Sequence, residues 1–170
     1  MEPLFLLARV LHVLLGVFWA GTLIFNAIFL LPSMRDAGPD AAKVAAGLTR
    51  RRFIDIMPVL ALVTILSGLY LYWHASSGFS PAYMRSSIGM TYGLGAVSSI
   101  IALGLGAGIL RPSMKRAGSL SQAMSTMNPE EAARTSAEVQ TLRVKVGKVG
   151  VIVAWLLGFT VITMALGRYL

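Results

Sequence analysis

Four apolar segments dominate this sequence and leave a chain of its length few ways to fold. Each is about 20 residues or longer, the length that an α-helix needs to cross the hydrocarbon core of a bilayer. They span about 4–31, 54–73, 87–110 and 147–169. With 56% hydrophobic and 13% charged residues, the chain also has about half the charge of an average soluble domain. We therefore predict one all-α domain over residues 1–170, an integral membrane four-helix bundle.

The basic residues predict how this bundle is oriented. The net charge is +8. Of the 15 Lys and Arg residues, 11 lie within two connections, about 32–53 and 111–146, and Lys148 lies just beside the second, whereas the connection between them has only Arg85. Because loops rich in Lys and Arg stay in the cytoplasm, both long connections are expected there and both termini outside. Such charges suit anionic lipid headgroups. No stacking aromatics accompany them, so nucleic acid is not an expected partner.

An internal repeat is visible at the ends of the first and third apolar segments. Residues 30–38 read LLPSMRDAG and residues 110–118 read LRPSMKRAG, which are identical at six of nine positions. A weaker match pairs VTILSGLYL, residues 63–71, with ITMALGRYL, residues 162–170. Two hairpins that both enter from outside predict a tandem duplication about an axis along the membrane normal.

Polar residues recur every seven positions along the first segment, at His12, Trp19 and Asn26. On a helix such positions drift only about 20° per heptad, so they share one face that must meet protein rather than lipid. The repeat offset of 80 carries them to a second set of polar or small residues: Tyr92, Ser99 and Gly106. We expect a packing seam between the first and third helices, formed by Trp19, Asn26, Ser99 and Gly106.

His12 is the main candidate for chemistry. It lies about 13 Å into its helix, and an ionisable residue at that depth is a functional hypothesis, as a ligand to a metal or haem or as a proton carrier. Alternatively, it is a neutral imidazole hydrogen-bonded to Tyr92 or to a backbone carbonyl. His74 is expected to be a solvated histidine of the interfacial aromatic belt. Alternatively, because it lies near the same membrane face, it could meet His12, and two imidazoles could hold haem b or copper. Arg9 either points outward, pairs with Glu2, or holds an anionic group such as a haem propionate.

Other polar and small residues carry structural expectations. Asn26 is expected to hydrogen-bond Ser98 or Thr160, and Asp55 to pair with one of three arginines at 50–52. Asn128, followed by proline and two glutamates, predicts the start of a helix, and a second, shorter helix is expected after Pro39. The pairs Gly89 and Gly93, and Gly104 and Gly108, predict close helix packing.

Several functional classes lack their signatures. The sequence has no cysteine, which excludes disulfides, thiolate metal sites and iron–sulfur clusters. It also has no phosphate-binding, metalloprotease or nucleophile-elbow motif, so no catalytic residue is assigned. The nine methionines are scattered rather than clustered, which favours packing over copper binding.

The run LHVLLGVFWAG at residues 11–21, followed by Pro32 and a basic connection, resembles the first helix of small bacterial membrane proteins related to copper-resistance protein D. It is distantly similar to the HemJ-type protoporphyrinogen oxidases. The first resemblance implies copper handling at the bacterial inner membrane. The second implies that a first-helix histidine, here His12, ligates haem, with a lysine on a later helix as its partner. The third segment has no lysine, and Tyr92 stands at that depth.

Three functions remain open on the sequence. The first is binding of a metal ion or haem b at a site drawn from His12, His74, Tyr92 and Arg9, for copper handling or electron transfer. The second is a non-catalytic subunit whose glycine-rich and aromatic surfaces dock other membrane subunits or a second copy of the chain. The third is a small-molecule or proton transporter with a cavity around Asn26 and Asp55.

Overall fold

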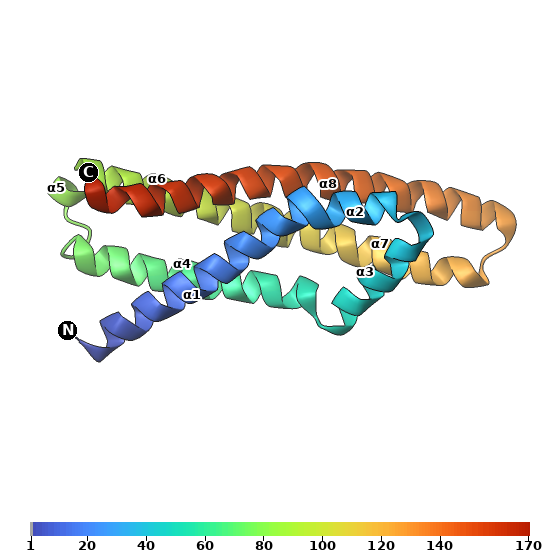
Figure 1. The fold of residues 1–170 in the computed structure, drawn as a ribbon, viewed down its shortest axis with the longest axis horizontal. Coiled ribbons are helices and arrows are strands. Elements are labelled where there is room, and N and C mark those ends of the chain that lie inside the picture. The colour runs from blue at the N-terminus through green and yellow to red at the C-terminus, as the bar shows by residue number, and fades with distance from the viewer. Residues whose placement is uncertain (1) are drawn as a thin grey trace.

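The computed structural model describes residues 2–170, which form an all-helical bundle without strands over that range (Figure 1). The main helices are α1 (Pro3–Phe25), α4 (Phe53–Ala75), α6 (Ser87–Leu105) and α8 (Pro129–Leu166). Shorter helices connect or extend them: α2 (Leu31–Asp36), α3 (Ala41–Arg50), α5 (Pro81–Met84) and α7 (Arg111–Ala123). Single 3-10 turns cover Gly38–Asp40, Met124–Thr126 and Gly167–Tyr169.

Four helical rods in the described residues are long and apolar enough to cross a membrane, as the sequence predicts. They run over Pro3–Asp36, Phe53–Ala75, Ser87–Thr126 and Pro129–Tyr169. The third and fourth are much longer than the predicted apolar segments and the first is slightly longer, because the connections at 32–53 and 111–146 are themselves largely helical. At 38 residues, α8 alone is about 57 Å long, nearly twice the thickness of the hydrocarbon core.

The bundle consists of two antiparallel hairpins packed side by side. α1 lies against α4, and α6 against α8, while α1 also contacts α8 and α4 contacts α6. α1 crosses the bundle obliquely, from α4 at its N-terminal end towards α8 (Figure 1). α1 and α6 therefore occupy opposite corners. The predicted seam between the first and third helices is not a main interface, because each of these helices packs mainly on α4 and α8.

The centre of the bundle is apolar and tightly closed. Trp19 and Ala20 of α1, Met57 and Ala61 of α4, Ala102 of α6, and Val153 and Leu157 of α8 form one buried cluster. Ala61, Ala102, Val153 and Leu157 are at most 1% exposed. Small residues at 61 and 102 let the helices approach closely around the single large indole of Trp19.

Two prolines shape the first and third rods in the same way. A π turn at Asn26–Leu30 precedes Pro32, and another at Gly106–Leu110 precedes Pro112. A proline inside a helix lacks an N–H and its ring collides with the carbonyl four residues earlier. Widening the turn relieves this collision: the Leu31 N–H reaches the carbonyl of Asn26, and the Arg111 N–H that of Gly106. Each rod continues past its proline.

The helix starts agree with the local sequence. The side chain of Asn128 accepts a hydrogen bond of 2.9 Å from the Glu131 N–H, which confirms the predicted start of α8. Ser86 caps α6 in the same manner, accepting from the Gly89 N–H at 3.1 Å. The predicted short helix in the first connection is α3.

Candidate functional site

His12 is held between α1 and α4 by a hydrogen bond to the main chain. Its Nδ1 lies 2.8 Å from the carbonyl oxygen of Thr64. A carbonyl only accepts, so Nδ1 carries the proton and donates it, and in the neutral ring Nε2 keeps a free lone pair. Of the two hydrogen-bond partners expected for His12, Tyr92 or a backbone carbonyl, the structure selects the carbonyl.

The ring of His12 fits onto α4 only because residue 68 is glycine. A Cβ atom at Gly68 would lie 2.6 Å from Cε1 and 2.8 Å from Nδ1 of His12, closer than real atoms come. Nε2 is farther away, at 3.5 Å. The glycine thus positions the ring so that its protonated edge meets α4.

The Nε2 atom is the unused group of this site. Within residues 2–170 it has no hydrogen-bond partner, while every fully buried polar side-chain atom there does. His12 is half-buried, so Nε2 reaches the surface of the bundle. A free polar atom facing hydrocarbon costs a few kcal/mol, roughly 1–3 in protein measurements. A ligand or a partner group at Nε2 would remove that cost.

His74 does not join His12, so the pair of imidazoles that the sequence left open is not formed. Its ring packs 4.8 Å from Phe5 and 6.5 Å from Tyr70, measured between ring centroids, and it is exposed. Because α1 and α4 are antiparallel, His12 lies level with Gly68. His74 lies six residues farther along α4, about 9 Å away along the axis. The two imidazoles therefore face different neighbours.

A bare metal ion finds few ligands in the described part of the chain. No group of three or more His, Asp or Glu side chains comes together within residues 2–170. A structural or catalytic metal ion is usually held by three or four protein ligands, whereas haem iron needs only one or two.

Tyr92 belongs to the other hairpin rather than to His12. Its ring lies against Gly167, where a Cβ would come within 2.6 Å of Cε1. Nearby, Tyr72 donates a hydrogen bond of 3.0 Å to the carbonyl of Gly89, and its ring meets Tyr83 edge-on at 5.8 Å. Tyr83 lies in α5, outside the spanning helices. Burial first, then Tyr92 and Tyr72, raise the pKa of Tyr83 above 10.0, so its phenol stays neutral at physiological pH.

Arg9 is exposed on an open face of α1 shared with four apolar residues: Leu6, Val10, Val13 and Leu14. Because α1 and α4 are antiparallel, Arg9 lies at a height along the bundle between His12 and His74. Arg9 therefore points outward, which is one of the three alternatives that the sequence left open.

The residues of the expected seam are separated by the actual packing. Trp19 is buried in the core and lines the same small hollow as Gly106. Ser99 is buried and donates to the carbonyl of Ala96 on its own helix, at 2.8 Å. Asn26 is half-buried at the start of the first π turn. The four residues share the interior of the bundle but do not form one interface.

Hydrogen bonds between α6 and α8 replace the bonds expected for Asn26. Ser98 donates to the carbonyl of Leu156 at 2.8 Å, and Thr160 donates to the carbonyl of Gly95 at 3.2 Å. Neither hydroxyl reaches Asn26. The sequence could not predict these bonds. The bonded residues are 58 and 65 positions apart, and which of them come level depends on how α6 and α8 pack in the folded hairpin.

Asp55 pairs with distant rather than neighbouring cations, which corrects the expected bond to the arginines at 50–52. Its Oδ1 lies 2.8 Å from Arg111 Nη2 and 2.7 Å from Lys115 Nζ. The π turn at Gly106–Leu110 and the following turn of α7 bring both cations onto the face towards α4. The carboxylate thus links the two hairpins where the apolar part of α6 ends.

Only half of the glycine pattern in α6 serves packing inside the chain. Gly89 lies against the backbone of Tyr83, and Gly93 faces the hydroxyl of Tyr72. Gly104 and Gly108, in contrast, are exposed, and a Cβ at either would meet nothing within 4 Å. For these two positions the expected close packing is not made within one chain.

The fold and these contacts define a class: a multi-pass, all-helical membrane protein with a half-buried histidine between two of its helices. No family model matches the chain, and neither a curated protein nor a solved structure matches it. The argument about function therefore rests on the residues themselves.

Proposed function

We propose that the protein binds haem b through His12 and serves in electron transfer across or along the membrane. The observation that carries the proposal is the bond from His12 Nδ1 to the Thr64 carbonyl. Such a bond fixes the tautomer and ring orientation of a ligating histidine and leaves Nε2 free to bind. Bound haem would supply one-electron oxidation and reduction.

The other residues of the proposed site would position His12 or bind the haem propionates, and none of them would ligate the iron. Gly68 leaves room for the ring of His12, and the Thr64 carbonyl keeps its proton on Nδ1. Arg9, one turn nearer the N-terminus of α1, is the nearest candidate for an anionic propionate. Copper handling, which the resemblance to copper-resistance protein D implies, is the weaker form of the proposal, because one imidazole is too few ligands for a copper ion.

The tandem duplication is part of the same proposal, and it explains why there would be one site per chain. The two π turns are offset by 80 residues, like the sequence repeat. His12 against Gly68 corresponds, at the repeat offsets of 80 and 99, to Tyr92 against Gly167. In both hairpins an aromatic ring packs on a glycine, but only the first ring offers a ligand nitrogen.

The proposed location is the bacterial inner membrane, with both termini outside and the α2–α3 and α7–α8 regions in the cytoplasm. The distribution of basic residues supports this orientation. His12 and His74 would then lie towards the outer face, where soluble electron carriers of that compartment could approach.

The test is a haemin titration of the purified protein in detergent, followed by absorption spectra of the oxidised and dithionite-reduced forms. His12→Ala is expected to lower the affinity more than about tenfold and to shift the Soret band, because the axial ligand is lost. His74→Ala, its matched control, should leave both unchanged. Equal binding by His12→Ala and the unaltered protein would overturn the proposal.

A second candidate is a non-catalytic subunit that docks other membrane helices or a second copy. The outward-facing Gly104 and Gly108 favour it, and so does Trp155, which is 77% exposed. Small residues on a lipid-facing surface permit close helix association. If haemin does not bind, this function can be tested with a Gly104→Cys variant that is crosslinked through its cysteine in native membranes. A single monomeric band would exclude the function.

A further inference from the structure

A shallow apolar hollow lies between the two hairpins, near the end of α6. α4 forms one wall with Phe53, Met57 and Pro58, and the π turn forms the other with Gly106 and Leu110. Trp19, only 3% exposed, forms its floor. The hollow is small, about 60 Å³, and it opens as a groove on the surface of the bundle. A Cβ at Gly106 would meet nothing within 4 Å, so this wall is open.

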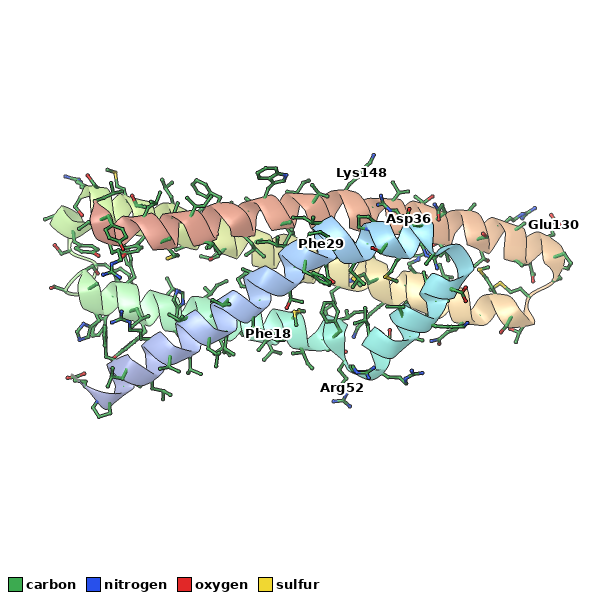
Figure 2. The ribbon with its side chains drawn as sticks, viewed as in Figure 1. Phe18, Phe29, Asp36, Arg52, Glu130 and Lys148 are labelled. Atoms are coloured by element: carbon green, nitrogen blue, oxygen red, sulfur yellow. The ribbon has the colours of Figure 1, made fainter. Side chains whose placement is uncertain are left out.

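The rim of this groove has an excess of positive charge. Arg111 and Lys115 both bind the single carboxylate of Asp55, so the three groups together keep one net positive charge. Their side chains are 45% and 49% exposed. At the start of α4, Arg52 projects away from the bundle on the same end (Figure 2). Arg111 and Lys115 therefore lie at the end of the apolar groove that faces the start of α4.

The distances from the cations to the apolar residues of α6 suit a molecule with a charged head at the rim and an apolar chain in the groove. Gly106 lies five residues before Arg111, about 7.5 Å deeper, and Ala102 about 13 Å deeper. Charge at one end and an apolar channel behind it are the complement of a phospholipid with an anionic headgroup. Water is a poor occupant, because the groove wall offers few polar partners.

We propose that this groove between α4 and the α6–α7 rod binds one anionic phospholipid, with a phosphate at Arg111 and Lys115 and an acyl chain beside Gly106 and Trp19. The lipid would bridge the two hairpins at the level of the second π turn. This inference does not depend on haem binding, and it identifies a site for lipid rather than for a protein partner.

Fluorescence quenching by brominated lipids tests the site through Trp19. Trp73 and Trp155 are replaced by Phe, because both are exposed to lipid and would respond to any brominated chain. The single-tryptophan protein is placed in phosphatidylcholine vesicles with the same minor fraction of either brominated phosphatidylglycerol or brominated phosphatidylcholine. We expect the anionic lipid to quench Trp19 at about one-fifth of the concentration that the neutral lipid requires, the preference of one uncompensated cation.

Two pairs of variants separate the groove from its rim. Gly106→Leu should fill the groove and abolish quenching of Trp19 by either lipid, whereas Gly104→Leu, on an open face two residues away, should not. Lys115→Gln should remove the preference for the anionic headgroup, and Arg134→Gln, paired with Glu130 at the far tip of α8, should retain it. Equal quenching by both lipids in the unaltered protein, or unchanged quenching in Gly106→Leu, would overturn the proposal.

Discussion

A single hydrogen bond and a single glycine define the environment of His12. The Thr64 carbonyl determines which ring nitrogen carries the proton, and the missing side chain at Gly68 lets the ring lie against α4. The sequence alone reveals that His12 lies within an apolar helix. It cannot reveal the partner, because Thr64 is 52 positions away and its carbonyl is common to every residue type.

Gly68→Ala is expected to displace the ring of His12 and break its bond to Thr64. The free energy of unfolding in detergent should fall by about 1–3 kcal/mol, from steric overlap and the lost hydrogen bond. In a His12→Ala background the same substitution should cost nearly nothing, because the space is already free. A double-mutant cycle measures this coupling. Additive losses would show that Gly68 and His12 do not interact.

At the scale of the helices, Pro32 and Pro112 determine where the first and third rods contain a π turn, after which the side chains point in a new direction. The π turn before Pro112 adds one residue to a turn, so α7 is rotated by about 100° relative to an uninterrupted α-helix. That rotation is what directs Arg111 and Lys115 to Asp55. Sequence reasoning placed Asp55 beside the nearest arginines instead, because a local pattern does not show how a wide turn re-aims residues far along the chain.

Pro112→Ala is expected to let the π turn close and to turn Arg111 and Lys115 away from Asp55. Asp55→Asn should then lower the free energy of unfolding of the original protein slightly, as for a partly exposed ion pair, but leave that of the Pro112→Ala protein unchanged. Chemical denaturation of the four proteins measures the difference. If Asp55→Asn has the same effect in both backgrounds, the proline is not the cause of the rotation.

At the scale of the whole molecule, hydropathy and helix caps were sufficient to predict four spanning helices and the start of α8. The arrangement of those helices was harder to predict. The polar stripe suggested that the first and third helices meet, whereas each contacts α4 and α8. Around the apolar centre, several helices bury hydroxyl groups, at Thr64, Ser98 and Thr163, so a polar stripe does not identify which neighbour it faces.

The orientation can be measured directly, because the chain has no cysteine of its own. Ser125→Cys, between α7 and α8, is expected to react with a membrane-impermeant maleimide only after cells are opened. Ser77→Cys, between α4 and α5, should react in intact cells. Both sites are exposed. The reverse pattern would place the termini in the cytoplasm.

The two rods of the second hairpin differ, because only one of them contains a π turn, and this difference affects how motion passes along the hairpin. α8 is continuous over 38 residues, and Glu130 lies at its exposed tip (Figure 2). Its other end lies beside Gly167, which packs against Tyr92. Its antiparallel neighbour is interrupted by the π turn at Gly106–Leu110. A twist applied at the tip would therefore be transmitted along α8 by an unbroken series of α-helical hydrogen bonds, whereas in the α6–α7 rod it would have to pass a wider turn. Of the two antiparallel rods, α8 is thus the stiffer connection between the tip and the far end of the bundle.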